Sequence, residues 1–304
     1  VPVDGSPAFT AADPLTSGEP LLTYLNSGGS IPELSSQLAE DAMIPASGIG
    51  AAQALLNPDN LLDLAILLVQ PDSANLHPSG RLYVFICEQD HYRTGFTSKV
   101  EEERFNPQIH TIQDLNGDSL SEIVFSDSSC GAHTCFAATR ILSWQNDGIT
   151  DLMAGTTDDL PFPVFDINPE PDPPTLSVTA TSIGSVGAGP FQPYRRTWEW
   201  NAESGLFEHG PDVLLPSGYR IHTLYKAEDL LAAGDVSEAI RTYDQVITDD
   251  TLSDWAEPAR EQAVLTAFAR FRILQAHTLA GNQPEAQTAY QELQETAPGD
   301  PGAP

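Results

Sequence analysis

The chain has 304 residues, of which 43 are acidic and 13 basic, so its formal net charge is −30. This length suits two domains better than one small core. The phosphates of nucleic acids and the surfaces of anionic membranes repel so acidic a chain, which argues against both as partners. The longest apolar run, residues 61–69, contains Asp63 and is too short for a transmembrane span.

Residues 1–20 begin with Val rather than Met and are rich in Pro, Gly, Ser and Asp. This composition is typical of a flexible leader at the mature N-terminus of a processed, secreted protein. Because residue 1 is not Cys, a lipoprotein anchor is not expected. Residues 21–45 read as a helical segment, since Ser30 and Glu33 have the spacing of a capping box with Pro32 in the first turn.

Two larger regions follow. Residues 46–215 alternate β-branched and aromatic runs with clusters of Gly, Pro, Asn and Asp, which predicts strands joined by turns. Residues 216–296 carry apolar residues at helical spacing and predict an all-helical domain. Residues 297–304 are expected to be disordered. The predicted class is therefore α+β, with a β domain before a helical one.

The β region repeats itself at an offset of 59 residues. Residues 55–68 align with residues 114–127, and at the same offset Arg81 falls on Arg140. The polar matches are Asn57 with Asn116, Asp59 with Asp118, and Asp63 with Glu122. A third, degenerate unit begins near residue 175 without the acidic loop. A register shared over tens of residues predicts a repeated structural unit.

The helical region also repeats, at an offset of 47 residues. Residues 230–246 and 278–293 align. The matched pairs are Gly234 with Gly281, Ala239 with Ala286, and Tyr243 with Tyr290. Small residues followed by an aromatic one a turn later are typical of closely packed helix hairpins.

These patterns resemble a known combination of repeats. "DLNGDSLSEIVF" at residues 114–125 resembles the calcium loop of FG-GAP or VCBS-type repeats, which form blades in integrin-like propellers and occur in secreted bacterial proteins. The C-terminal pair resembles tetratricopeptide-type hairpins, although the spacing is 47 rather than 34. Ser119 stands where the β family usually has Gly. The resemblance implies about three propeller-blade-like units followed by a tetratricopeptide-like domain, fewer units than an ordinary closed propeller needs.

The acidic loop predicts a calcium site. Asp114, Asn116 and Asp118 lie at alternate positions, followed by the Leu120 carbonyl and Glu122. Ca²⁺ prefers six to eight such hard oxygen ligands, and the crowded carboxylates would repel one another without a cation. An EF-hand is excluded because Phe125 occupies its last ligand position and the flanks read as strands. The alternative is an Asx-rich turn without an ion, since Asn-Gly favours turns by itself.

A weaker second calcium site is expected in the first unit. That copy keeps Asn57, Asp59 and Asp63 but has Leu55 in place of the first Asp. With one carboxylate fewer, it should bind calcium weakly or not at all.

The three cysteines are Cys87, Cys130 and Cys135. The close spacing of Cys130 and Cys135 predicts a disulfide, as an oxidising compartment would permit. The alternative is a zinc site formed by Cys130, His133, Cys135 and Cys87, but the paired C-x-x-C spacing of such sites is missing. We expect Cys87, in an apolar strand, to be a buried free thiol.

Other candidates have ordinary structural explanations. "GSVGAG" at residues 184–189 reads as a hairpin rather than a phosphate loop, and Trp144, Trp198 and Trp200 as sheet residues rather than a sugar platform. His222 is expected to pack or hydrogen-bond. No familiar nucleophile motif is present, so a non-enzymatic function is expected.

The sequence therefore predicts a secreted or cell-surface protein that binds calcium. Its partner would be another protein or a second copy of itself, bound through strand edges or the helical domain. The alternative is a secreted hydrolase acting on polysaccharide or protein.

Overall fold

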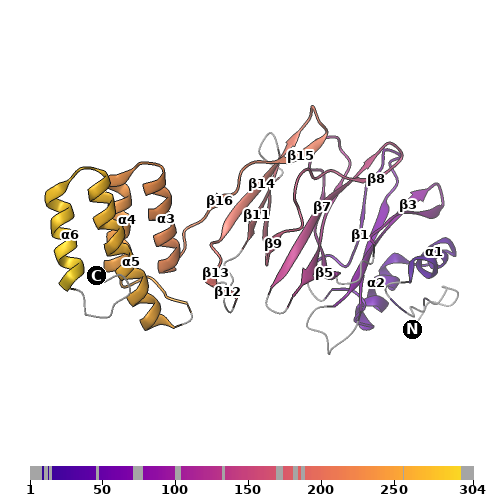
Figure 1. Cartoon of the computed structure of the whole chain (residues 1–304). Coiled ribbons are helices and arrows are strands. Elements are labelled where there is room, and N and C mark those ends of the chain that lie inside the picture. The colour runs from indigo at the N-terminus through magenta and orange to yellow at the C-terminus, as the bar shows by residue number, and fades with distance from the viewer. Residues whose placement is uncertain are drawn as a thin grey trace. The chain divides into compact units, whose positions relative to one another are not determined.

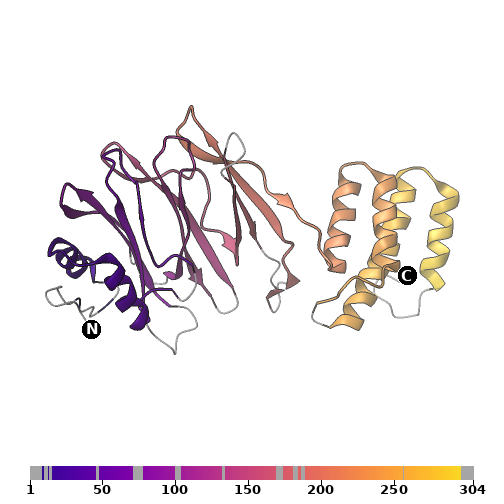
Figure 2. The ribbon, with the colours of Figure 1, turned by 180° about the vertical axis from the view of Figure 1, so that it is seen from behind.

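The computed structural model describes residues 9, 13, 16–45, 48–70, 78–99, 104–131, 134–168, 174–180, 184–185, 189–255 and 257–295. The chain forms two compact units, one of Val1–Ala180 with Arg195–Val213 and one of Thr181–Tyr194 with Leu214–Pro304. Strands dominate the first unit and helices the second (Figure 1, and Figure 2 from behind). The predicted α+β class is confirmed: antiparallel sheets precede a set of C-terminal helices.

Three sheets of the first unit are built as meanders, in which strands that follow one another along the chain are neighbours, except that a short hairpin comes between the second and third strands of the third sheet. Their orders are β1-β2-β3-β4, β5-β6-β7-β8 and β10-β11-β14-β15. The strands of the first two are β1 (Ala51–Ala54), β2 (Asp63–Val69), β3 (Gly80–Glu88), β4 (His91–Thr97), β5 (Arg104–Gln113), β6 (Glu122–Cys130), β7 (Cys135–Gln145) and β8 (Gly148–Asp151). Those of the third are β10 (Val164–Asn168), β11 (Thr175–Ala180), β14 (Tyr194–Asn201) and β15 (Leu206–His209).

Short strands complete these sheets. β9 (Leu160–Pro161) pairs with β7, and β16 (Val213–Leu214) pairs with β14. β12 (Gly184–Ser185) and β13 (Gly189–Pro190) pair with each other in a separate two-stranded sheet. The "GSVGAG" stretch therefore joins the two strands of a small hairpin, as expected.

The strand register supports the repeat of 59 residues for the first two strands of each unit. Ala54 pairs with Asp63 in the first sheet, and Gln113 pairs with Glu122 in the second, so both partners are 59 residues apart. The third strands differ from the prediction, because Ile66 pairs with Tyr83 whereas Phe125 pairs with Arg140. Arg140 is thus equivalent to Tyr83 and not to Arg81. The chain from Ile66 to its partner Tyr83 is two residues longer than the chain from Phe125 to its partner Arg140.

Both faces of β2 are buried, which explains the continuous apolar run in its sequence. Leu64, Ile66 and Leu68 pack in one core with the N-terminal helices, and Ala65 and Leu67 belong to a second core. In most antiparallel sheets one face meets water and polar residues alternate with apolar ones. Here the strand is covered from both sides, so alternation is lost.

The N-terminal helices α1 (Gly18–Asn26) and α2 (Ile31–Glu40) cover the outer face of the first sheet. The predicted capping box is present in part, because the Ser30 hydroxyl accepts the N–H of Glu33 at 3.4 Å. Two observations differ from the predicted leader at residues 1–20. Helix α1 begins at Gly18, and Phe9 is buried against Tyr24.

The second core lies between the first and second sheets. Val84 and Ile86 of β3 pack there with Ile123 and Phe125 of β6 and Leu142 of β7. Burying these side chains contributes about 1.5–3 kcal/mol each. The two sheets are thereby fixed face to face, and the loops at their edges are held by this packing.

The helical unit consists of two helix hairpins. Its helices are α3 (Arg220–Ala232), α4 (Val236–Thr248), α5 (Pro258–Leu279) and α6 (Gln283–Glu295). Gly234 and Gly281 follow the first helix of each hairpin with φ of +85° and +74°, which is the conformation that favours Gly at helix ends. The turns therefore repeat at the predicted offset of 47 residues.

The matched residues of the two hairpins differ in burial. Tyr243 is fully buried whereas Tyr290 is 43% exposed. Tyr290 lies on α6, which packs against α5 among the described helices. The expected tail at residues 297–304 lies outside the described residues. None of the helices described in the structure has the length and apolar composition needed to cross a membrane.

Candidate functional site

The acidic loop between β5 and β6 brings the five predicted ligands together. The sheet fixes both ends of the loop, because Gln113 and Glu122 are paired residues of neighbouring strands. Within the loop, Gly117 and Ser119 have φ of +82° and +71°. The left-handed conformation at Ser119 gives a physical reason for the Gly that the resembling repeats have there. Asn60, at the equivalent position of the first loop, has φ of +64°.

Backbone N–H groups donate hydrogen bonds to several carboxylate oxygens of the acidic loop. The two oxygens of Asp114 accept the N–H groups of Gly117 at 2.8 Å and Ser119 at 2.9 Å. Oδ1 of Asp118 accepts the N–H of Leu120 at 2.8 Å. These bonds are Asx-type turns, as the alternative interpretation of the loop expects.

One side-chain arrangement goes beyond a turn. The Nδ2 amide of Asn116 donates to Oδ2 of Asp118 at 3.2 Å and to Oε1 of Glu122 at 3.0 Å. Two carboxylates from different parts of the loop therefore face one point, and a positively polarised N–H group lies at that point. A carboxylate pair converging in this way is a donor set that suits a hard cation.

Glu122 is the buried member of this set, with no exposed surface. Its Oε2 accepts the N–H of Leu115 at 2.7 Å, and its Oε1 accepts the hydroxyl of Ser143 at 2.8 Å. Burial raises the pKa of Glu122 to about 7, opposed by these hydrogen bonds and assisted by the nearby charges of Asp118 and Asp114. A cation next to this carboxylate would favour its ionised form.

Several hydrogen bonds of the second loop recur in the first loop at the offset of 59. The N–H of Leu56 donates to Oδ2 of Asp63 at 3.1 Å, matching Leu115 and Glu122. The Asn57 amide donates to Asp59 at 3.2 Å, matching Asn116 and Asp118. Asp63 is fully buried, and burial raises its pKa. Its shorter side chain accepts the Cys87 N–H at 2.8 Å. The first loop has one carboxylate fewer because Leu55 stands in place of the first Asp.

The types of ligand in the acidic loop suit calcium, whereas their hydrogen bonds to one another and to the backbone leave the loop closed around itself. Among the described residues, no three His, Cys, Asp or Glu side chains already surround one point. Asp118 and Glu122 meet at the Asn116 amide, while Asp114 is engaged by backbone N–H groups. A bound cation would have Asp118, Glu122 and the side-chain oxygen of Asn116 within reach. Its arrival requires the Asn116 amide to turn.

The disulfide prediction is confirmed. Cys130 and Cys135 are bonded and lie opposite each other at the end of the β6–β7 hairpin. Their thiols are therefore not available for the alternative zinc site, whose His133 lies outside the described residues. Cys87 is a free thiol, as predicted, but it is half-buried whereas a buried thiol was predicted.

The tryptophans show different environments. Trp198 is fully buried and its indole N–H donates to the carbonyl of Ala154 at 3.2 Å. Trp200 packs against Phe207 with ring centroids 5.2 Å apart. Trp144 is partly buried beside the second core. These contacts agree with the expected structural role.

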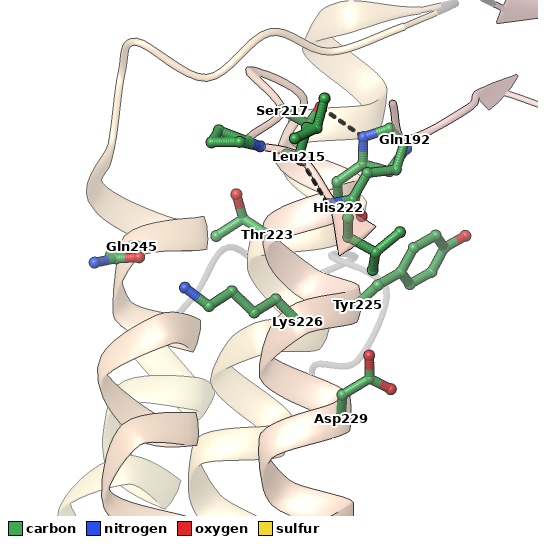
Figure 3. Close-up of a pocket in the computed structure, with 11 residues that line it drawn as sticks. Gln192, Leu215, Ser217, His222, Thr223, Tyr225, Lys226, Asp229 and Gln245 are labelled. Carbon is green, nitrogen blue, oxygen red and sulfur yellow. Dashed lines mark hydrogen bonds between the residues drawn. The ribbon is translucent and has the colours of Figure 1, made fainter. Parts of the chain in front are cut away.

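The helical unit contains a second candidate site, a pocket of about 460 Å³ beside α3 (Figure 3). Lys226 of α3 extends toward Gln245 of α4 within it (Figure 3). The lining residues are Gln192, Leu214, Leu215, Pro216, Ser217, His222, Thr223, Tyr225, Lys226, Asp229 and Gln245. Sequence reasoning did not find this pocket, because its residues come from separate stretches of the chain.

His222 is fixed at one end of this pocket. Its Nε2 lies 2.9 Å from the carbonyl oxygen of Pro190, which can only accept, so Nε2 carries the proton. In the neutral imidazole, Nδ1 then accepts the hydroxyl of Ser217 at 2.6 Å. The expectation that His222 forms hydrogen bonds is confirmed. Ser217 also accepts the N–H of Tyr219 at 3.2 Å, so the pair secures the start of α3.

Comparison of the chain with protein-family models and with curated proteins finds no match.

Proposed function

We propose that the chain is an extracellular interaction protein that binds calcium in the loop between β5 and β6. The metal would be held by Asp114, Asn116, Asp118, the Leu120 carbonyl and Glu122. It would neutralise the carboxylates and stiffen the edge of the second sheet. The helical unit would serve as the docking surface for a protein partner or a second copy of the chain.

The observation that carries this proposal is the shared point faced by Asp118 and Glu122. Both carboxylates lie within 3.2 Å of the single Asn116 Nδ2 atom. Separating two carboxylates would relieve their repulsion, yet the sheet holds Glu122 in place and the turn holds Asp118. A divalent cation has the charge and the oxygen preference that this arrangement lacks.

The repeat supports a finer assignment of the folds. Each of the three meanders would be a propeller-blade-like unit of the FG-GAP or VCBS type, and the two hairpins would be tetratricopeptide-like. Support comes from the equivalent loops 59 residues apart and from the equivalent Gly turns 47 residues apart. Such helical repeats commonly present extended binding surfaces.

Secretion is proposed on two grounds. The Cys130–Cys135 disulfide is a bond that persists in oxidising compartments. The net charge of −30 would also be better tolerated where calcium is abundant.

Calorimetry on the full chain tests the calcium proposal. The melting temperature should rise with added calcium and fall with a chelator, because a ligand of the folded state stabilises by about 2.7 kcal/mol at a hundredfold excess over Kd. Magnesium should compete poorly, since it demands octahedral geometry. Asp118→Asn keeps an acceptor for the Leu120 N–H but removes the charge, and should abolish the response.

The matched control is Asp59→Asn in the first loop, which should keep most of the calcium response. A wild-type melt that ignores both calcium and chelator would show that the loop is only a turn. Equal losses in both variants would assign calcium to both loops.

A further inference from the structure

The two hairpins of the helical unit can be compared position by position, because their helices are in the same register. Helix α4 spans Val236–Thr248 and α6 spans Gln283–Glu295, so both ends are shifted by 47 residues. Helices α3 and α5 also end 47 residues apart, at Ala232 and Leu279. Each residue of the first hairpin therefore has a counterpart in the second.

Helix α5 covers one face of the first hairpin. Leu224 of α3 and Tyr243 of α4 are buried, and they pack in one core with Leu265 of α5. Across the same contact, Arg272 of α5 donates to both carboxylate oxygens of Glu228, at 2.7 and 2.6 Å. The first hairpin thus shows what covers this face, namely the first helix of another hairpin.

The counterparts of these buried residues are exposed in the second hairpin. Phe271 corresponds to Leu224 and is 37% exposed, whereas Leu224 is 4% exposed. Tyr290 corresponds to Tyr243 and is 43% exposed, whereas Tyr243 is fully buried. One turn before Phe271 on α5, Phe268 is 40% exposed. Three aromatic side chains therefore meet water on a face built like the covered one.

This face, which we call the end face, runs along both helices of the second hairpin. On α5 its residues recur at the spacing of one helix side and are Val264, Phe268, Phe271, Gln275 and Leu279. On α6 they are Gln287, Tyr290 and Gln294. None of these side chains is charged, in a chain with 43 acidic residues. Aromatic residues without charges are typical of the centre of a protein–protein interface.

We propose that the end face pairs with the end face of a second copy of the chain, forming a dimer with two-fold symmetry. This pairing rests on the proposed role of the helical unit as a docking surface, and it names both the surface and its partner. In a two-fold contact the same residues of both copies meet, so the aromatic rings can pack against one another. Acidic surfaces repel their copies, whereas the uncharged end face does not.

The size of the end face predicts a dimer of moderate affinity. Helix α5 has 22 residues and is therefore about 33 Å long. Because packed helices lie about 8–10 Å apart, α5 and α6 together present roughly 500 Å². A standard interface buries about 800 Å² on each partner. We therefore expect a micromolar Kd.

Analytical ultracentrifugation of the full chain tests the proposal, with chelator present so that calcium has no part in the result. We expect a monomer–dimer equilibrium with a Kd of about 1–100 μM. Raising the salt from about 50 to about 300 mM should strengthen dimerisation several-fold, because it screens the repulsion between two chains of charge −30 and leaves the apolar contact intact.

Two variants probe the end face itself. Gln287→Glu keeps the shape of an exposed side chain and adds an acid to each copy, so it should weaken dimerisation at least tenfold. Tyr290→Gln removes an exposed ring and should also weaken it at least tenfold. The matched control is Gln291→Glu on the same helix, which should dimerise as the wild type does. Its counterpart in the covered hairpin, Asp244, is exposed.

Four results would overturn the proposal. The wild type could stay monomeric, its dimer could weaken with salt, or the dimer could persist in both Gln287→Glu and Tyr290→Gln. The fourth result is dimerisation that occurs only after residues 296–304 are removed, which would assign the end face to that segment of the same chain. The calcium response of the melting temperature is measured separately, so a monomeric wild type would leave the proposed calcium site untouched.

Discussion

Ser143 in β7 donates its hydroxyl to Oε1 of Glu122 in β6 at 2.8 Å, and both residues are buried. The bond joins the base of the acidic loop to the third strand of its own sheet. In the first sheet, the equivalent residue Asp63 has a shorter side chain, and it accepts a hydrogen bond from the backbone N–H of Cys87 instead. The loop geometry is therefore held by the sheet beneath it.

Ser143→Ala should lower the free energy of unfolding by about 1–3 kcal/mol, since it leaves a buried carboxylate oxygen without this donor. Urea unfolding measured in the presence of chelator gives the value. Ser129→Ala, an exposed change on β6, should have an effect below about 0.5 kcal/mol. Similar losses in both variants would show that the bond has no special role.

The pH dependence of stability should separate Glu122 from His110. Burial raises the pKa of Glu122 to about 7, and burial lowers the pKa of His110 to about 4. Without calcium, the Glu122 contribution is lost as pH rises from about 4.5 to 7, because the folded carboxyl keeps its proton longer than the unfolded one. The His110 contribution has the opposite sign and is lost as pH falls from about 6.5 to 4. Each is worth up to about 3 kcal/mol.

Two variants check these signs with chelator present. Glu122→Gln should make stability increase more steeply between pH 4.5 and 7 than in the wild type. His110→Gln, which can still bond to Ser126, should make the increase less steep. Parallel pH profiles for the wild type and both variants would contradict the assignment.

Ser119→Gly should stabilise the metal-free protein by about 0.5–1 kcal/mol. Ser119 holds a φ of +71° that a side chain disfavours and Gly adopts freely. Thermal unfolding measures the gain, and Ser121→Gly is the control in the same loop. The control should destabilise by a similar amount through backbone entropy alone. A loss of stability in Ser119→Gly would mean that the left-handed conformation is not populated.

Arg220→Ala should lower the free energy of unfolding of the helical unit by about 3–5 kcal/mol. Arg220 is 1% exposed, pairs with Asp254 at 3.1 Å and donates to the carbonyl of Val246, so its removal leaves a buried carboxylate unpaired. Arg241→Ala breaks only an exposed pair with Glu238 and should cost less than about 1 kcal/mol. Far-UV circular dichroism in urea follows both. Equal losses of unfolding free energy in the two variants would contradict the stabilising role of the buried Arg220–Asp254 pair.

Mass spectrometry of the unreduced chain should find one disulfide and one alkylatable thiol, that of Cys87. Replacing Cys130 and Cys135 together by Ala should destabilise by about 2 kcal/mol, as expected for a short closed loop. Cys87→Ala serves as the comparison and should cost less. Three free thiols in the native protein would overturn the pairing.

Several features were predictable because they depend on residues close in the sequence. The helix ends at Gly234 and Gly281 and the Asx turns of the acidic loop each follow from local rules of spacing and backbone conformation. The 59-residue repeat was visible because two such local patterns recur in the sequence. The disulfide was likewise predicted from two cysteines in one hairpin. Turns, helix ends and short disulfide loops depend on neighbouring residues, so they can be predicted from the sequence alone.

Other features depend on pairing between distant segments. The counterpart of Arg140 is Tyr83 and not Arg81, because the connection before it differs in length between the two units. Aligning identical residues at one constant offset gives the wrong pair here. The ion pairs of Asp127 with Arg104 and Arg140 form only when β5, β6 and β7 are brought together. Composition and local spacing thus determined the class, the repeats and the acidic loop. Tertiary packing decided which carboxylates are buried, which charges converge and where a ligand can enter, because burial and proximity belong to the folded chain as a whole.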